Sequence, residues 1–281
     1  MTEWLRVLTF SAALSVGVAR AAVLPFGILN AVVSQTEDGV KPASGYEFRP
    51  GETVFLAFQI AGVKPSAQNK IKLKYQVMAL DPFGVAIIPA LSGAVDTDVA
   101  PEDKDWMPKV RKIAEIPPLG PSGSYKFALS VTDEATGRTD IKEVEFPVRG
   151  RAVEPSATLA LRNFTFFRSE EDRAPLSIAA YRQGDAVWAR FDITGYMIGV
   201  GNRFDVDFQV SVTGPSGNLL YTQPEPTPEQ RAPFYTQRYV PAEFSLSLSK
   251  DASLGEYGLA ITVRDNAGAQ KIEARQPFRV E

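Results

Sequence analysis

Apolar and polar residues alternate with a period of two in several separate stretches of the chain. The clearest apolar faces are Val54, Leu56, Phe58 and Ile60; Ile71, Leu73, Tyr75 and Val77; and Tyr125, Phe127, Leu129 and Val131. Because successive side chains of a strand point to opposite faces, this pattern predicts half-buried β-strands. Turn residues such as Pro50-Gly51 and Asp81-Pro82-Phe83-Gly84 separate them. The pattern predicts an all-β fold of antiparallel Ig-like sandwiches.

The same pattern occurs twice, about 133 residues apart. Val187 repeats Val54, Phe204 repeats Ile71, and Pro215-Ser216-Gly217 repeats Pro82-Phe83-Gly84. Further strands are expected near residues 28–34 and 159–167, at the start of each copy. The repeat therefore predicts two tandem β-sandwiches. The predicted ranges are a leader over residues 1–21, a first sandwich over 22–150, a linker over 151–158 and a second sandwich over 159–281.

The first residues resemble a secretory signal peptide. An uncharged stretch of twelve residues, Val7 to Val18, lies between Arg6 and the sequence Ala19-Arg20-Ala21. This layout predicts cleavage after Ala21. The stretch is shorter than the roughly 20 apolar residues that cross a bilayer. We therefore expect a secreted or periplasmic protein with no membrane span in the mature chain.

The chain contains no histidine and no cysteine. This composition excludes a Ser-His-Asp triad, metal sites built on imidazole or thiolate, and disulfide bonds. The formal net charge of −3 argues against binding to nucleic acid, since that affinity rests on neutralised phosphates. A glycosidase-like carboxylate pair has no support in the sequence. We expect no enzymatic activity, no cofactor and no metal.

Short motifs in each copy resemble known sandwich families. Tyr125 lies two residues before Phe127, where Ig-like domains carry a tyrosine corner followed by a cysteine. The segment from Phe48 to Val54, together with Asp81-Pro82-x-Gly84, resembles the macroglobulin-type (MG2-like) modules of secreted defence proteins. That resemblance implies protein contact or spacing rather than catalysis. The thioester of larger family members needs a cysteine that this chain lacks.

The polar face of one predicted strand is basic, whereas its counterpart in the second copy is largely acidic. The two sets are Lys70, Lys72 and Lys74, and Arg203, Asp205 and Asp207. Surfaces of different charge on equivalent strands suggest separate partners or head-to-tail self-association. The alternative is a solvated face whose charges discourage aggregation at the sheet edge.

Two aromatic residues, Phe55 and Trp188, fall on equivalent outward-pointing positions of the two copies. Such residues can stack on sugars or anchor a protein interface. They can equally be covered by a loop or by the other domain.

Two connecting segments differ between the copies. Five carboxylates between Asp96 and Asp105 form either a solvated acidic loop or a calcium loop. The counterpart from Pro224 to Pro228 is typical of a stiff polyproline II connection.

These observations favour a non-catalytic secreted or periplasmic protein that binds or spaces other components through two Ig-like modules. Its partner would be an extracytoplasmic protein or a glycan. A pair of carbohydrate-binding modules is one alternative, with the outward aromatics as its platform. A periplasmic chaperone that pairs an edge strand with its subunits is the other.

Overall fold

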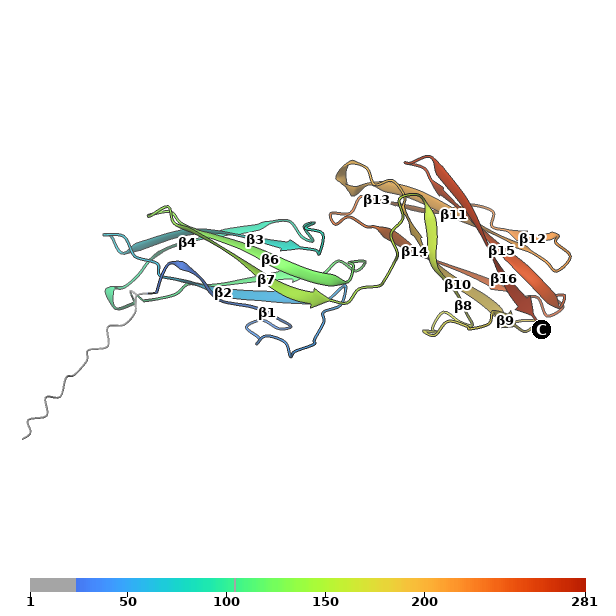
Figure 1. The fold of residues 1–281 in the computed structure, drawn as a ribbon, viewed down its shortest axis with the longest axis horizontal. Coiled ribbons are helices and arrows are strands. Elements are labelled where there is room, and N and C mark those ends of the chain that lie inside the picture. Colours follow the sequence, from blue (N-terminus) through green and yellow to red (C-terminus); the bar gives the residue numbers. More distant parts are fainter. Residues whose placement is uncertain (1–23, 104) are drawn as a thin grey trace, which may run out of the picture.

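The computed structural model describes residues 24–103 and 105–281, so the predicted leader lies outside the described residues. Within these ranges the chain forms strands β1 to β16 and two short 3-10 turns, η1 (Pro101–Asp103) and η2 (Val200–Asn202). The strands form two sandwiches that lie end to end (Figure 1). The described ranges contain no helix with the length and apolarity needed to cross a membrane. The predicted all-β fold is confirmed.

The first sandwich consists of a three-stranded and a four-stranded antiparallel sheet. The smaller sheet has the order β1 (Gly27–Ser34), β2 (Thr53–Ala61) and β5 (Lys109–Glu115), and the larger has β4 (Leu91–Asp98), β3 (Lys70–Leu80), β6 (Gly123–Asp133) and β7 (Thr139–Val148).

The second sandwich repeats this order and adds short strands at the edges of its larger sheet. The smaller sheet has β8 (Ala160–Phe167), β10 (Ala186–Thr194) and β14 (Tyr239–Ser247). In the larger, β11 (Phe204–Thr213) pairs with β12 (Leu219–Thr222), β13 (Thr227–Arg231) and β15 (Gly255–Asp265), followed by β16 (Gln270–Val280) and β9 (Ala180–Tyr181).

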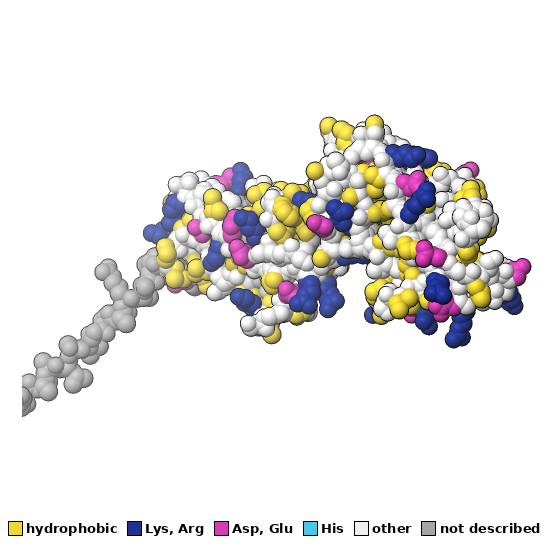
Figure 2. All heavy atoms as spheres, turned by 45° about the vertical axis from the view of Figure 1, so that its right-hand side comes forward, with side chains coloured by type: hydrophobic (Ala, Val, Ile, Leu, Met, Phe, Trp, Pro, Cys, Tyr) yellow, Lys and Arg dark blue, Asp and Glu magenta, His cyan; other side chains and the backbone are white. Residues whose placement is uncertain are grey.

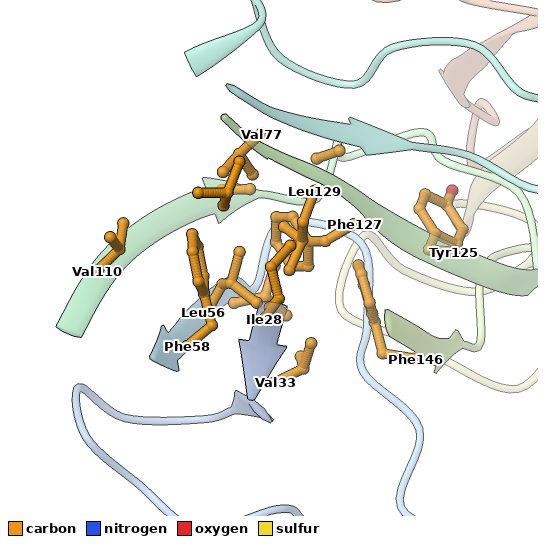
Figure 3. Packing of buried hydrophobic residues seen from close by; sticks show 14 of the residues in the cluster. Ile28, Val33, Leu56, Phe58, Val77, Val110, Tyr125, Phe127, Leu129 and Phe146 are labelled. Carbon is orange, nitrogen blue, oxygen red and sulfur yellow. The ribbon is translucent and has the colours of Figure 1, made fainter. Parts of the chain in front are cut away.

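The alternating apolar residues fill the space between the two sheets of each sandwich. In the first copy Leu56 and Phe58 from one sheet pack with Phe127 and Leu129 from the other, all of them buried (Figure 3). The burial alternates along β6 and again along its counterpart β15. The period-two pattern therefore identified the inward faces of these strands correctly.

The two copies share their unusual backbone conformations as well as their apolar faces. Residues with positive φ recur as pairs: Asn30 (49°) with Asn163 (50°), Gly51 (85°) with Gly184 (84°), Asn69 (58°) with Asn202 (59°), and Gly84 (78°) with Gly217 (81°). Glycine and asparagine tolerate this left-handed region better than other residues. The duplication has therefore preserved the turns that set the path of the chain.

A tyrosine corner occurs in both sandwiches. The Tyr125 hydroxyl donates to the carbonyl of Pro121 at 3.0 Å, and the Tyr257 hydroxyl donates to the carbonyl of Ser253 at 2.8 Å. Each bond ties the start of an inner strand to the connection that precedes it, as in Ig-like domains. The resemblance of Gly123-Ser124-Tyr125 to this feature is confirmed.

Two of the predicted connections contain regular structure. Thr227 and Pro228 belong to β13, which pairs with β11, so the segment from Pro224 to Pro228 is not wholly a polyproline II connection. Proline is tolerated there because β13 lies at the edge of the sheet. Asp96 and Asp98 belong to β4, so the acidic stretch is not a single loop.

Replacing Tyr257 by phenylalanine should lower the free energy of unfolding by about 1 kcal/mol, because the corner loses one partly buried hydrogen bond. Urea unfolding measures the change. Tyr221→Phe in the same sandwich is the control, since Tyr221 is half-buried and its hydroxyl has no hydrogen-bond partner among the described residues. Equal stabilities of the two variants would contradict a stabilising role for the corner.

Candidate interdomain site

A buried carboxylate lies at the end of the first sandwich that faces the second. Asp81 begins the turn after β3, and its Oδ1 accepts hydrogen bonds from the backbone N–H groups of Phe83 and Val85, each at 2.8 Å. Gly84 closes the turn with φ of 78°. These bonds fix the side chain and leave Oδ2 for partners from elsewhere. The Asp81 side chain is fully buried.

Both partners of Oδ2 come from the second sandwich. The Tyr235 hydroxyl donates to it at 2.9 Å and Arg238 Nη1 donates to it at 3.1 Å. Arg238 Nη1 also lies 3.0 Å from the Tyr235 hydroxyl, so the three groups form a closed triangle. The guanidinium group lies over the ring of Phe83, 4.6 Å from its centroid. We call Asp81, Phe83, Tyr235 and Arg238 the interdomain clamp.

The loop that carries Tyr235 and Arg238 is shaped by Asn202 of its own sandwich. Asn202 Nδ2 donates to the carbonyls of Pro233, at 3.2 Å, and Phe234, at 2.5 Å. Its Oδ1 accepts from Thr236 Oγ1 at 2.9 Å. Because the Asn202 side chain bonds to Pro233, Phe234 and Thr236, which lie on both sides of Tyr235, the loop presents Tyr235 in a defined position.

Tyr235 is buried against the hydrophobic core of the first sandwich, although it belongs to the second. Burial raises the pKa of its hydroxyl, and the hydrogen bond to the Asp81 carboxylate raises it further. Burial followed by the charge of Asp81 also raises the pKa of Tyr125 to about 12. Tyr125 lies at one end of the cluster drawn in Figure 3. Both phenols therefore remain protonated at neutral pH.

The segment that joins the sandwiches is attached at both of its ends. Ser122 Oγ and the backbone of Gly150 exchange hydrogen bonds of 2.9 and 3.0 Å on the first sandwich. Two residues later the chain is held by the second sandwich, where Asn163 Nδ2 donates to the carbonyl of Ala152 at 2.8 Å. Little free chain remains between these attachments, which limits movement at the joint.

Arg151 in this segment pairs with Asp192, whose side chain is fully buried in the second sandwich. The ion pair measures 2.9 Å, and Asn163 donates to the same carboxylate oxygen at 2.8 Å. Burial raises the pKa of Asp192, although Asn163 and Arg151 act in the opposite direction. The equivalent bond in the first sandwich joins Asn30 to the neutral Gln59 at 2.6 Å. The charge at position 192 is therefore a feature of the second copy alone.

The predicted basic face is paired with carboxylates. Lys70 lies 3.9 Å from Asp98 and Lys72 lies 3.7 Å from Asp96, both across the pairing of β3 with β4. Lys74 forms an ion pair with Glu134. The lysine face and part of the acidic stretch thus form a single ladder of exposed ion pairs, and such pairs contribute little to stability.

The acidic counterpart in the second sandwich is also engaged locally. Asp205 accepts hydrogen bonds from Gln230 at 3.1 Å and from Asn266 at 3.0 Å. Asp207 accepts from the same Asn266 amide at 3.0 Å and from Arg264 at 3.4 Å. Basic and acidic groups lie next to each other at several places on the surface in view (Figure 2).

Phe55 and Trp188 occupy equivalent places on the middle strands of the two smaller sheets, as predicted. Phe55 pairs with Ile113 of β5, and Trp188 pairs with Phe167 of β8. Both side chains are half-buried on the outer face of their sheet. They lie in different sandwiches, and the structure does not bring them into one site. Their role as partner-binding residues stays a prediction.

The carboxylates of the acidic stretch do not gather. In residues 24–103 and 105–281, no group of three or more histidine, cysteine or acidic side chains is arranged to hold a metal ion. Asp96 and Asp98 are instead spaced along β4 opposite their lysines.

The clamp was not predicted from the sequence. A signal for it exists in the comparison of the two copies, because the turn Asp81-Pro82-Phe83-Gly84 has Gly214-Pro215-Ser216-Gly217 as its counterpart. Aspartate at a turn is usually explained by bonds to its own backbone, and Asp81 makes those bonds too. The contact with Tyr235, 154 residues away, depends on the placement of the two sandwiches.

Comparison with known proteins adds little to this picture. No family model and no curated protein matches the chain. Among solved structures, the C-terminal domain of the Streptococcus agalactiae antigen I/II polypeptide BspA has 12% identity, a TM-score of 0.31, and coverage of 89% of this chain and 99% of that one. The C-terminal domain of Streptococcus pyogenes AspA has 10% identity, a TM-score of 0.32, and coverage of 89% and 98%.

A red sea bream transglutaminase has 9% identity and a TM-score of 0.27, with coverage of 93% of this chain and 32% of that one. Similarity at this level identifies neither a family nor an activity. The macroglobulin-type resemblance therefore stays a prediction.

Arg151→Ala should destabilise the protein by about 1–3 kcal/mol, because it leaves the buried Asp192 carboxylate without its cation. Adding Asp192→Asn should recover most of the loss, since an amide occupies the equivalent position 59 in the first copy. Chemical unfolding of the two single variants and the double variant measures this coupling. Additive effects would contradict the pairing.

Raising the pH above 10 should weaken the wild-type fold, because unfolded tyrosines ionise near pH 10 while Tyr235 stays protonated in the folded state to a higher pH. The raised pKa of Tyr235 makes its full contribution to the free energy of unfolding below about pH 10. This contribution is lost as the pH rises toward the pKa of Tyr235 in the folded protein. Tyr235→Phe should therefore show a shallower loss of stability, measured by urea unfolding across this range. Parallel curves would contradict the burial of the phenol.

Proposed function

We propose that this protein is a non-catalytic, extracytoplasmic binding and spacer protein whose two Ig-like sandwiches act as one rigid unit. It works in the periplasm or outside the cell and contacts a protein or a glycan there. The observation that carries the proposal is the interdomain clamp, a buried charge-assisted contact between the two sandwiches. Such a contact fixes the distance and the angle between the two sandwiches, and a spacer protein requires both.

The roles of the other buried carboxylates support a structural purpose. Asp133 accepts hydrogen bonds from Ala135 N–H at 3.0 Å and from Thr136 Oγ1 at 2.6 Å. Its counterpart Asp265 accepts from the N–H groups of Gly268 and Met197, each at 2.8 Å. These carboxylates hold turns in place, as does Asp81 through Oδ1. General acid–base chemistry would instead call for a carboxyl group that faces a substrate.

The predicted leader and the macroglobulin-type turn motifs fit the same proposal. A cleaved leader would place the mature chain outside the cytoplasm, and modules of that type act as spacers and contact surfaces. The domain ranges 22–150 and 159–281, with a linker over 151–158, belong to this proposal as well. Specific contacts are expected on the surfaces that differ between the copies, including the ladder at Lys70, Lys72 and Lys74 and the cluster at Asp205 and Asp207.

Small-angle scattering tests the rigid-spacer proposal. The wild-type profile should fit a single arrangement of the two sandwiches. Replacing both Tyr235 and Arg238 by alanine removes the two donors to Asp81 Oδ2, and the stranded charge should favour opening of the joint. The variant should show a larger radius of gyration and a broader distribution of dimensions, whereas the exposed-site control Glu273→Ala should match the wild type.

A wild-type profile that needs a broad ensemble would contradict the rigid spacer. So would a double variant that folds and scatters like the wild type. Circular dichroism and the unfolding curve of the double variant separate an opened joint from a protein that has lost its fold.

A further inference from the structure

The end of the second sandwich that faces away from the first carries an open apolar hollow. It has a volume of about 600 Å³, and its lining combines the apolar residues Pro215, Leu220, Leu248 and Tyr257 with polar residues that include Asp251. Leu219, Leu220 and the neighbouring Leu254 are 63%, 53% and 64% exposed. A group of exposed leucines beside a hollow is a common sign of an interaction surface.

By sequence position this hollow corresponds to the end of the first sandwich at Asp81 and Tyr125, against which Tyr235 packs. The equivalent residues, in the order of the first and second copies, are Pro82 and Pro215, Ile87 and Leu220, Ile116 and Leu248, and Tyr125 and Tyr257. The backbone near these residues is also similarly packed in the two copies. A Cβ on Gly123 would meet Pro82 at 2.6 Å, and one on Gly255 would meet Pro215 at 2.9 Å.

The two surfaces differ at the residue that makes the clamp. Asp81 of the first copy is replaced by Gly214 in the second, and a Cβ there would lie 2.8 Å from Leu220 Cδ1. Leucine thus takes the place of the buried carboxylate. The hollow has no counterpart of Asp81, although Asp251 is among its lining residues, and its apolar part beside Leu220 suits an apolar or aromatic side chain better than an arginine.

The first sandwich carries the counterpart of the loop that holds Tyr235 and Arg238, at the end of the molecule opposite the hollow. At the spacing of 132 residues that relates Gly255 to Gly123, the counterpart of Arg238 is Trp106 and that of Tyr235 is Asp103. Trp106 is 44% exposed, and its backbone N–H donates to the carbonyl of Asp103 at 2.8 Å. The loop that lacks a counterpart of Arg238 thus belongs to the same chain as the hollow that lacks a counterpart of Asp81.

We propose that the hollow takes the Trp106 loop from a second copy of this chain. The contact between copies would use the same two ends as the joint inside each copy, but Trp106, and not Asp103, would enter the hollow and pack against Leu220. Because the loop and the hollow lie at opposite ends of the molecule, the contact is heterologous and produces chains or rings of several copies rather than two-fold dimers. The inference goes beyond the proposed function, and it requires no external partner.

Sedimentation equilibrium of protein expressed from the complete coding sequence tests the contact. In the internal joint, the linker holds the two sandwiches at an effective concentration of about 1 mM. The contact between copies has no such linker, so the protein concentrations in the experiment should extend to about 1 mM. The average mass should rise steadily with concentration and pass that of a dimer. Leu220→Arg and Trp106→Ala should each abolish the rise, whereas Ile141→Arg, at an exposed position on β7, should leave it unchanged.

Mixing the two blocked variants gives the sharpest result. Leu220→Arg keeps its tryptophan and Trp106→Ala keeps its hollow, so the mixture should form a one-to-one heterodimer and stop there. A wild-type protein that stays monomeric over the whole range overturns the proposal, as does association that either variant leaves intact or a mixture that stays monomeric. Scattering from the monomeric variants still reports on the internal joint, so failure here is distinguishable from failure of the proposed spacer role.

Discussion

The placement of the two sandwiches depends on one buried charge. The Asp81 carboxylate lies out of contact with water, and its Oδ2 is bonded only through the loop that carries Tyr235 and Arg238 among the described residues. An ionised carboxylate in this position is costly unless it is paired, so separating the sandwiches carries a penalty beyond the loss of apolar contact. Arg151 and Asp192 add a second pairing of this kind at the linker. Together they make the joint a specific contact.

The duplication explains what is common to the two halves, and the exceptions to it explain how they fit together. The inward apolar faces, the tyrosine corners and the left-handed asparagines and glycines recur in both copies. The joint uses residues that do not recur: Asp81 stands opposite Gly214, Asp192 opposite Gln59, and Tyr235 opposite Asp103. A domain that is copied can keep its core unchanged while a few end residues become specific for the neighbouring copy.

The fold was largely predictable from the sequence, because strands such as β2 and β6 bury alternate side chains that any period-two reading identifies. Edge strands were harder to predict from the sequence. β4 and β13 are half-exposed, and their carboxylates and prolines are residues more typical of loops. Phe55 and Trp188 were placed correctly on outward faces. The ion pairs of Lys70 and Lys72 with β4 follow from strand pairing, which was not predicted. The clamp depends on contacts between domains, which no local pattern encodes.

The absence of cysteine makes the central claim directly measurable, since two introduced cysteines give a uniquely labelled pair. Spin labels at Ile141→Cys on β7 and Arg275→Cys on β16 report the separation of the sandwiches through electron–electron dipolar coupling. A joint held by Asp81, Tyr235 and Arg238 predicts one narrow distance distribution that broadens when Arg238 is replaced by alanine. A distribution that is already broad in the parent protein, or one that Arg238→Ala leaves unchanged, would contradict the account.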